Sequence, residues 1–172
     1  VLRRSVAHAL KKLGIKSIGV FKPKVNTTDT LSKIIVLISF NSINPFLTLD
    51  AELAKDKNYL QAGTEYLNAN YKLRLSAYLG RSIKGFIDHP FLALPALESP
   101  RENRVYELRG SESATEAIHA NKVDMFNAAG KIPHFSRLEF NAVFYGQLIS
   151  SAKMPNLMYM TPFSNQESRD AH

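Results

Sequence analysis

The chain contains no cysteine among its 172 residues. This absence excludes disulfides, thiolate metal sites and cysteine nucleophiles, and it leaves the cellular compartment unassigned, since cysteine-free proteins suit reducing and oxidising surroundings alike. Long hydrophobic runs are missing too. No apolar stretch approaches the roughly 20 residues that cross a bilayer, so the sequence predicts no membrane span.

Sequence motifs of catalysis are also scarce. The chain has no Gly-rich phosphate loop, no G-x-S-x-G elbow and no convincing triad, which disfavours nucleotide-binding proteins and hydrolases. None of the histidines has a partner at H-x-x-x-H spacing. We therefore expect no metal and no cofactor, and we keep a metal or haem role for His119 or His134 as a minor alternative.

Positive charge is in excess, with a formal net charge of +7. A basic surface favours phosphate backbones. The basic residues, however, gather only between Arg3 and Lys24 and are otherwise spread singly, without a nucleic-acid motif. We expect no nucleic-acid partner. Because 45% of the residues are hydrophobic, the chain can bury a core.

The first half reads as helix, strand, turn, strand and helices. Apolar residues at helical spacing end at Gly14, and Ile15–Phe21 then alternates as a strand does. Lys33–Phe40 is apolar on both faces, which predicts a sheet covered on both sides. Asn44-Pro45 is typical of a helix start. The helix that follows has an inward stripe of Phe46, Leu49 and Leu53.

The second half repeats strand, helix, strand and strand. Arg104–Arg109 alternates, and a helix is expected from the capping-box spacing of Ser113 and Glu116 to Gly130. Strands at Phe140–Ile149 and Asn156–Thr161 form a predicted hairpin. The spacing of Ser164 and Glu167 predicts one more helix.

Hydrophobic positions of the two halves align at an offset near 125 residues, which indicates a duplicated unit. We expect a first unit at 1–84, a packed Pro-rich linker at 85–102 and a second unit at 103–172. The alignment also suggests that the first unit lacks its first strand here and the second its last helix and strand. The sequence is therefore interpreted as a piece of a longer chain.

Several segments resemble the NIPSNAP family: YELR (106–109), HANKVDMFN (119–127), FSRLEFNAVFYGQLISSAKMPNLMYMTPF (135–163) and SRDAH (168–172). LGIKSIGVFKPK (13–24) resembles the first half of tandem members. The chain departs from the family pattern at Gly110-Ser111, after YELR. The resemblance implies an α+β fold of ferredoxin-like antiparallel sheets with helices on one face, in which two tandem units form a dimeric α+β barrel.

The resemblance carries over no catalytic residues, since the family's biochemistry is unsettled, with links to vesicle traffic and mitochondrial quality control. We expect a protein that acts through protein association, with homo-oligomers favoured. The alternative is a small-molecule binder, or an enzyme resembling the cofactor-independent monooxygenases of the superfamily, that uses the barrel cavity.

Four residues are the candidate lining of that cavity. Glu107 and Arg109 share one face of a strand, where an Arg fork suits a carboxylate or phosphate, although an ion pair that fixes the sheet is the commoner use. Asn121 interrupts a predicted inward stripe of Ala114, Ile118, Met125 and Ala129, and it binds either a ligand or the backbone. Tyr145 either lines an apolar pocket or belongs to the core.

Overall fold

The computed structural model describes residues 2–24, 35–40, 42–68, 84–86, 99–127, 137, 142–149 and 153–171. They form a mixed α+β fold with small antiparallel sheets. The chain divides into two compact units, Val1–Arg81 and Ser82–His172, and each is described by itself. Most of the predicted linker lies outside the described residues.

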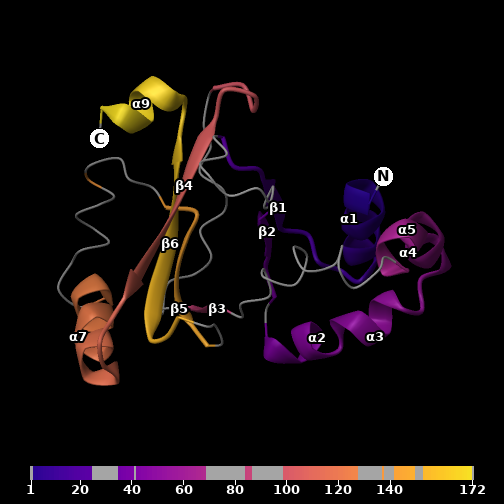
Figure 1. The fold of residues 1–172 in the computed structure, drawn as a ribbon, viewed down its shortest axis with the longest axis horizontal. Coiled ribbons are helices and arrows are strands. Elements are labelled where there is room, and N and C mark those ends of the chain that lie inside the picture. Colours follow the sequence, from indigo (N-terminus) through magenta and orange to yellow (C-terminus); the bar gives the residue numbers. More distant parts are fainter. Residues whose placement is uncertain are drawn as a thin grey trace. The chain divides into compact units, whose positions relative to one another are not determined.

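The first unit combines a two-stranded sheet with short helices (Figure 1). Its elements are α1 (Leu2–Lys12), β1 (Ile18–Phe21), β2 (Ile35–Ile38), α2 (Ile43–Leu47), α3 (Leu49–Leu53), α4 (Lys57–Ala62) and α5 (Thr64–Leu67). The helix predicted after Asn44-Pro45 is therefore two helices. It begins one residue before Asn44, with Ser42 at the N-cap position.

The core of the first unit is made by α1 and α3. Ala9, Leu10, Leu49 and Leu53 are buried together with Ile15, as the helical spacing predicts. Gly14 ends α1 with a φ of 80°, a left-handed conformation that glycine adopts without strain.

The strands β1 and β2 confirm two predicted strands of the first half and pair antiparallel, with Ile18 opposite Ile38. The expectation that both faces of β2 are covered is wrong in part, because Ile35 and Val36 are 38% and 43% exposed. In the described part of the unit, β1 is the only strand beside β2, and the core packs against Ile18, Ile38 and Phe40. A two-stranded sheet cannot bury every apolar side chain of β2.

The second unit is built on a four-stranded antiparallel sheet in the order β3-β5-β6-β4. Its elements are β3 (Lys84–Phe86), β4 (Val105–Glu112), α7 (Glu116–Asn127), β5 (Phe144–Leu148), β6 (Asn156–Phe163) and α9 (Gln166–Asp170). Gly85 and Phe86, which the sequence assigns to the linker, belong to the edge strand β3. The predicted hairpin of β5 and β6 is confirmed, with Tyr145 opposite Tyr159.

The inner strand β6 pairs antiparallel with β4 on one side and with β5 on the other. The strands β4 and β5 therefore run parallel to each other, although they are not neighbours. The segment containing α7 joins them, and β6 fills the space between them (Figure 1). This topology is a split β-α-β unit.

Helix α7 faces the sheet with a different side from the one predicted. Val123 and Phe126 are buried against Tyr145 and Leu157, whereas Ile118 and Met125 are 52% and 42% exposed. The predicted inward stripe is therefore wrong for Ala114, Ile118 and Met125, and Ala129 lies outside the described residues. Because Phe126 is the largest apolar side chain of the helix, burying its ring decides which side turns inward.

Both predicted capping boxes are replaced by other caps. The Thr115 hydroxyl accepts a bond from the backbone N–H of Ile118 at 3.2 Å and so caps α7. The buried Ser113 hydroxyl has no hydrogen-bond partner among the described residues. At α9 the Asn165 side chain accepts from the N–H of Ser168 at 2.7 Å. The sequence predicted both helices, and the observed caps lie two residues after Ser113 and one residue after Ser164.

The described residues show one two-stranded and one four-stranded sheet. They do not show tandem ferredoxin-like units or a closed barrel, so that part of the expected architecture is not part of the observed fold. The α+β class and the antiparallel pairing are observed. No described helix is long and apolar enough to span a lipid bilayer.

Candidate functional site

Three of the side chains that carry polar chemistry form a row across the sheet of the second unit. Arg109 on β4 lies opposite Tyr159 on β6, and Tyr159 lies opposite Tyr145 on β5. The two tyrosine rings are 5.8 Å apart between centroids. Cross-strand neighbours on one face interact directly, so this Arg–Tyr row (Arg109, Tyr159 and Tyr145) is fixed by the register of the strands.

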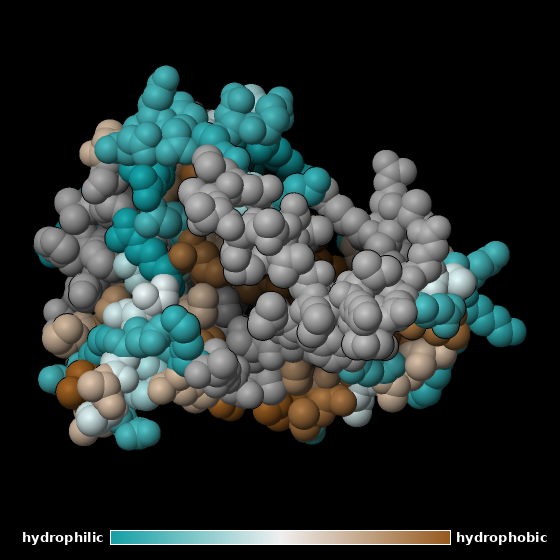
Figure 2. All heavy atoms as spheres, in the orientation of Figure 1, coloured by the Kyte–Doolittle hydropathy of each residue, from teal (hydrophilic) through white to brown (hydrophobic). Residues whose placement is uncertain are grey.

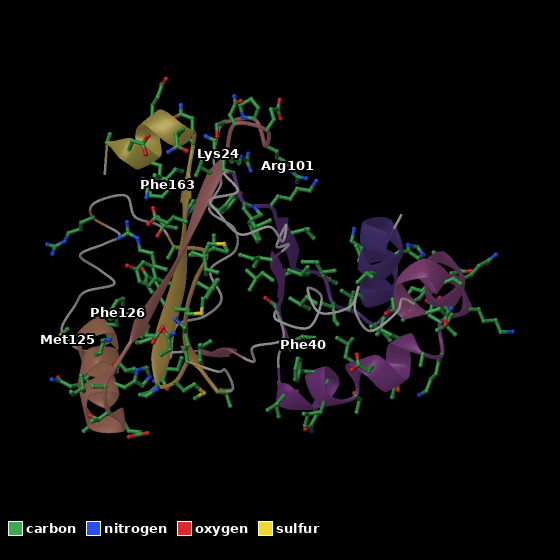
Figure 3. The ribbon with its side chains drawn as sticks, viewed as in Figure 1. Lys24, Phe40, Arg101, Met125, Phe126 and Phe163 are labelled. Atoms are coloured by element: carbon green, nitrogen blue, oxygen red, sulfur yellow. The ribbon has the colours of Figure 1, made fainter. Side chains whose placement is uncertain are left out.

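The Arg–Tyr row lies on the face of the sheet that helix α7 covers. The ring of Phe126 packs against Tyr145 at 5.8 Å and against Tyr159 at 6.0 Å. The ammonium group of Lys122 donates to the Ser111 hydroxyl at 2.9 Å, which attaches the same helix to β4. Figure 3 shows Phe126 and Met125 on α7, with Phe126 nearer the strands.

Glu107 on β4 connects the strand to the C-terminal helix α9. One carboxylate oxygen accepts from Nε of Arg109, and the other accepts from Nε of Arg169 on α9 at 2.9 Å. The hydrogen bond from Arg109 has the largest effect on the pKa of Glu107. Together with the bond from Arg169, it holds that pKa below its ordinary value, although burial opposes the shift. The carboxylate is therefore charged at neutral pH and has a donor on each oxygen.

Arg109 is the exposed end of the Arg–Tyr row, with 53% of its side chain accessible. Hydrogen bonding to Glu107, and then to Tyr159, raises its pKa above the ordinary value. A guanidinium has five N–H donors, and the bond to Glu107 uses Nε. The group can therefore meet a carboxylate or phosphate from solvent without leaving Glu107.

Tyr145 is the buried end of the row. Burial raises its pKa to about 12, and the neighbouring Tyr159 adds to the shift. Its phenol remains protonated near neutral pH and belongs to the core cluster with Val123, Phe126 and Leu157. It is not poised to act as a general base.

The structure brings Glu107, Arg109 and Tyr145 to one face of the sheet, but it does not bring Asn121 to them. Asn121 is exposed on α7, on the side away from Val123 and Phe126. Its amide needs no buried partner, because water reaches it. Three of the four predicted residues thus share one face of the sheet, and α7 and α9 contact that face.

Three participants were missed when the sequence alone was read: Tyr159 as the bridge, Arg169 as the second partner of Glu107, and Lys122 as the contact between α7 and β4. The register explains Tyr159, since alternation places it on the same face as Leu157. No local signal identifies Arg169, whose partner is 62 residues away in sequence.

Among the described residues there is no group of three or more metal-binding side chains. His119 was considered for a metal or haem role. Its Nδ1 atom is buried and has no hydrogen-bond partner among the described residues. His134 lies outside the described residues.

Comparisons with models of known protein families, with curated proteins and with solved structures give no match to this chain.

Proposed function

We propose that this chain is a NIPSNAP-like protein that acts through association with a second copy of itself and not through catalysis. One observation carries this proposal: helix α7 exposes two large apolar side chains on one face, Ile118 and Met125, which are 52% and 42% accessible and seven residues apart. A second copy that covers these side chains removes their apolar surface from water.

The split β-α-β topology supports the architectural part of the proposal. A ferredoxin-like unit begins with strand, helix, strand, strand, and its third strand lies between the first two. The elements β4, α7, β5 and β6 follow that order, and α9 comes next as the second helix would. We propose that both units adopt this fold and that their sheets contribute to an α+β barrel.

The use of the polar side chains favours association over chemistry. Both oxygens of Glu107 accept from arginines, and Tyr145 is covered by Phe126. These groups hold helices to the sheet. The exposed Ile118 and Met125 of α7, by contrast, do not belong to the core cluster in the described part of the unit. Figure 2 shows apolar and hydrophilic atoms side by side over this helix, in contrast to the hydrophilic surface over α9.

Analytical ultracentrifugation of the full chain tests the proposal. We expect the weight-average mass to rise from that of one 19.3 kDa chain toward twice that value between micromolar and near-millimolar concentration. High salt should leave the association in place, because contacts between apolar side chains are not screened as surface charges are. A monomer mass at every concentration refutes self-association.

A second candidate is binding of a small carboxylate or phosphate at Arg109, including the enzyme-like use of such a site. The half-exposed guanidinium of Arg109 favours it. Titration with acetate and with inorganic phosphate, followed by NMR, tests this function in the wild type and in Arg109→Ala. Equal shifts in both proteins remove Arg109 from any such site.

A further inference from the structure

The excess positive charge of the chain lies in its first segment. The first 28 residues contain seven of the 22 lysines and arginines and no aspartate or glutamate. The remainder therefore has 15 basic and 15 acidic residues and carries no net charge. The seven basic residues are Arg3, Arg4, Lys11, Lys12, Lys16, Lys22 and Lys24. A charge concentrated in this way favours an anionic partner for the first unit.

Helix α1 directs part of this charge away from the core. Ala9 and Leu10 are buried in the core cluster of the first unit, whereas the next two residues, Lys11 and Lys12, are exposed. A helix that buries one side turns its opposite side to solvent. The packing of α1 in the core therefore fixes the outward direction of both lysines.

The chain turns directly after these lysines. The N–H of Gly14 donates to the carbonyl of Lys11 at 3.0 Å, which closes a turn at the end of α1. Lys16 follows this turn and is exposed. Leu13 lies between the lysines in sequence and is 41% exposed. The turn thus presents an apolar side chain among basic ones.

An ion pair joins the start of α4 to this end of α1, and the two helices lie side by side (Figure 1). Nζ of Lys12 lies 2.9 Å from a carboxylate oxygen of Asp56, the N-cap residue of α4. Lys57, the first residue of α4, is exposed, and Leu60 is 40% exposed. Residues three apart are neighbours on a helix surface. The start of α4 therefore also places a lysine beside an exposed leucine.

The carboxylate at this junction is already engaged. Asp56 accepts from Lys12 and from two backbone N–H groups of α4, and its side chain is 16% exposed. Lys11, Lys16 and Lys57 form no ion pair within the part of the chain that the structure describes. Their charge is therefore available to a partner. We define the basic patch as Lys11, Leu13, Lys16, Lys57 and Leu60.

The apolar members of the basic patch favour a lipid surface over a nucleic acid. Among the side chains that the structure describes, every aromatic one is buried or partly buried. Single-stranded nucleic acids are held by aromatic side chains on which their bases stack. A bilayer with anionic headgroups instead attracts lysines to its surface and takes up leucines at the boundary of its acyl chains.

We infer that the basic patch binds the anionic surface of a lipid bilayer. The lysines meet the headgroups, and Leu13 and Leu60 reach the boundary of the acyl chains. The binding is peripheral and reversible, because the apolar side of α1 stays in the core of the unit. This inference goes beyond the proposed self-association, which uses α7 of the second unit.

Vesicle flotation of the full chain tests the inference. The probes are vesicles of phosphatidylcholine alone and mixed vesicles in which about 40% of the lipid is phosphatidylserine. We expect binding to the mixed vesicles at low salt and little binding to the neutral ones. Binding should weaken as salt rises, because ions screen the attraction between lysines and headgroups.

Charge removal is compared at two places on the chain. The double variant Lys11→Gln/Lys16→Gln should bind the mixed vesicles about 25-fold more weakly, at about fivefold for each lysine. The double variant Arg101→Gln/Lys153→Gln is the matched control, because it removes the same charge from exposed positions of the second unit. Its binding should stay within about twofold of the wild-type value, since only charges at the membrane contribute.

Exchange of the leucines separates a bilayer from other anionic partners. Leu13→Ser/Leu60→Ser leaves the charge unchanged and should weaken binding to the mixed vesicles about fivefold, because less apolar surface enters the bilayer. Circular dichroism checks that this variant is folded, and the lysine variants decide the outcome if it is not. Binding of an RNA oligonucleotide is measured in parallel.

The outcomes either support or overturn the inference. Selective loss of vesicle binding in Lys11→Gln/Lys16→Gln supports it. Absence of wild-type binding to the mixed vesicles overturns it, and so does an equal loss in both charge variants. RNA binding that displaces the vesicles and is unchanged by the leucine exchange assigns the basic patch to nucleic acid and also overturns it. Ultracentrifugation without lipid measures self-association separately, so either proposal can fail alone.

Discussion

Replacing Phe126 by Ala tests which face of α7 packs on the sheet. Phe126 is 4% exposed and its ring meets those of Tyr145 and Tyr159. Removing a buried phenylalanine ring costs about 3–5 kcal/mol through lost transfer energy and the cavity left behind. That is a large share of the roughly 5–15 kcal/mol that stabilises a typical domain. We therefore expect partial or complete loss of the folded second unit.

Met125→Ala is the matched control, because Met125 is the neighbouring residue and is 42% exposed. Its truncation should change the free energy of unfolding by about 0.5 kcal/mol or less. Urea unfolding of both variants, followed by far-UV circular dichroism and tyrosine fluorescence, gives the comparison. If Met125→Ala costs as much as Phe126→Ala, the helix packs through the Ile118 and Met125 side and the assigned face is refuted.

Three further substitutions test the ion pair, the buried phenol and the helix cap. Glu107→Gln should cost about 1 kcal/mol at neutral pH, since its arginine partners are partly exposed. Because the pKa of Glu107 is lowered in the folded state, the wild type should be more stable than the variant above the ordinary pKa of a glutamate. This difference in stability should be lost as the pH falls through the lowered pKa, and a pH-independent difference in urea midpoints contradicts this. The wild type should lose stability on the order of 2–3 kcal/mol between about pH 10 and 12, and the Tyr145→Phe variant should not show this loss. If the variant unfolds at alkaline pH as the wild type does, Tyr145 is not a buried phenol. Thr115→Ala should lower stability by about 1 kcal/mol while Ser113→Ala does not, and the reverse order in thermal melts restores the capping box predicted from sequence.

Elements with strong local signals were predictable from the sequence. Gly14 marks the end of α1, and the alternating apolar residues of β5 and β6 give a hairpin whose pairing the structure confirms. Of the candidate site, Glu107 and Arg109 share a face as alternation requires, and they bond to each other. These results follow from short-range geometry, which repeats every two residues in a strand and every 3.6 in a helix.

The side of α7 that packs inward was not predictable in this way. Apolar residues occur on both sides of the helix, so its sequence periodicity fits either face. The choice depends on which ring finds a partner on the sheet, and Phe126 finds Tyr145 and Tyr159. Asn121 was placed on the wrong side for the same reason.

The sequence by itself determined the α+β class and the strand pairing of the second hairpin. Only the tertiary structure decided that β6 lies between β4 and β5, that α7 covers the tyrosines of the Arg–Tyr row, and that Arg169 reaches Glu107. The physical reason is distance along the chain. Hydrogen-bond alternation and helical spacing act between near neighbours, whereas burial and ion pairing join residues whose separation in sequence carries no local signal.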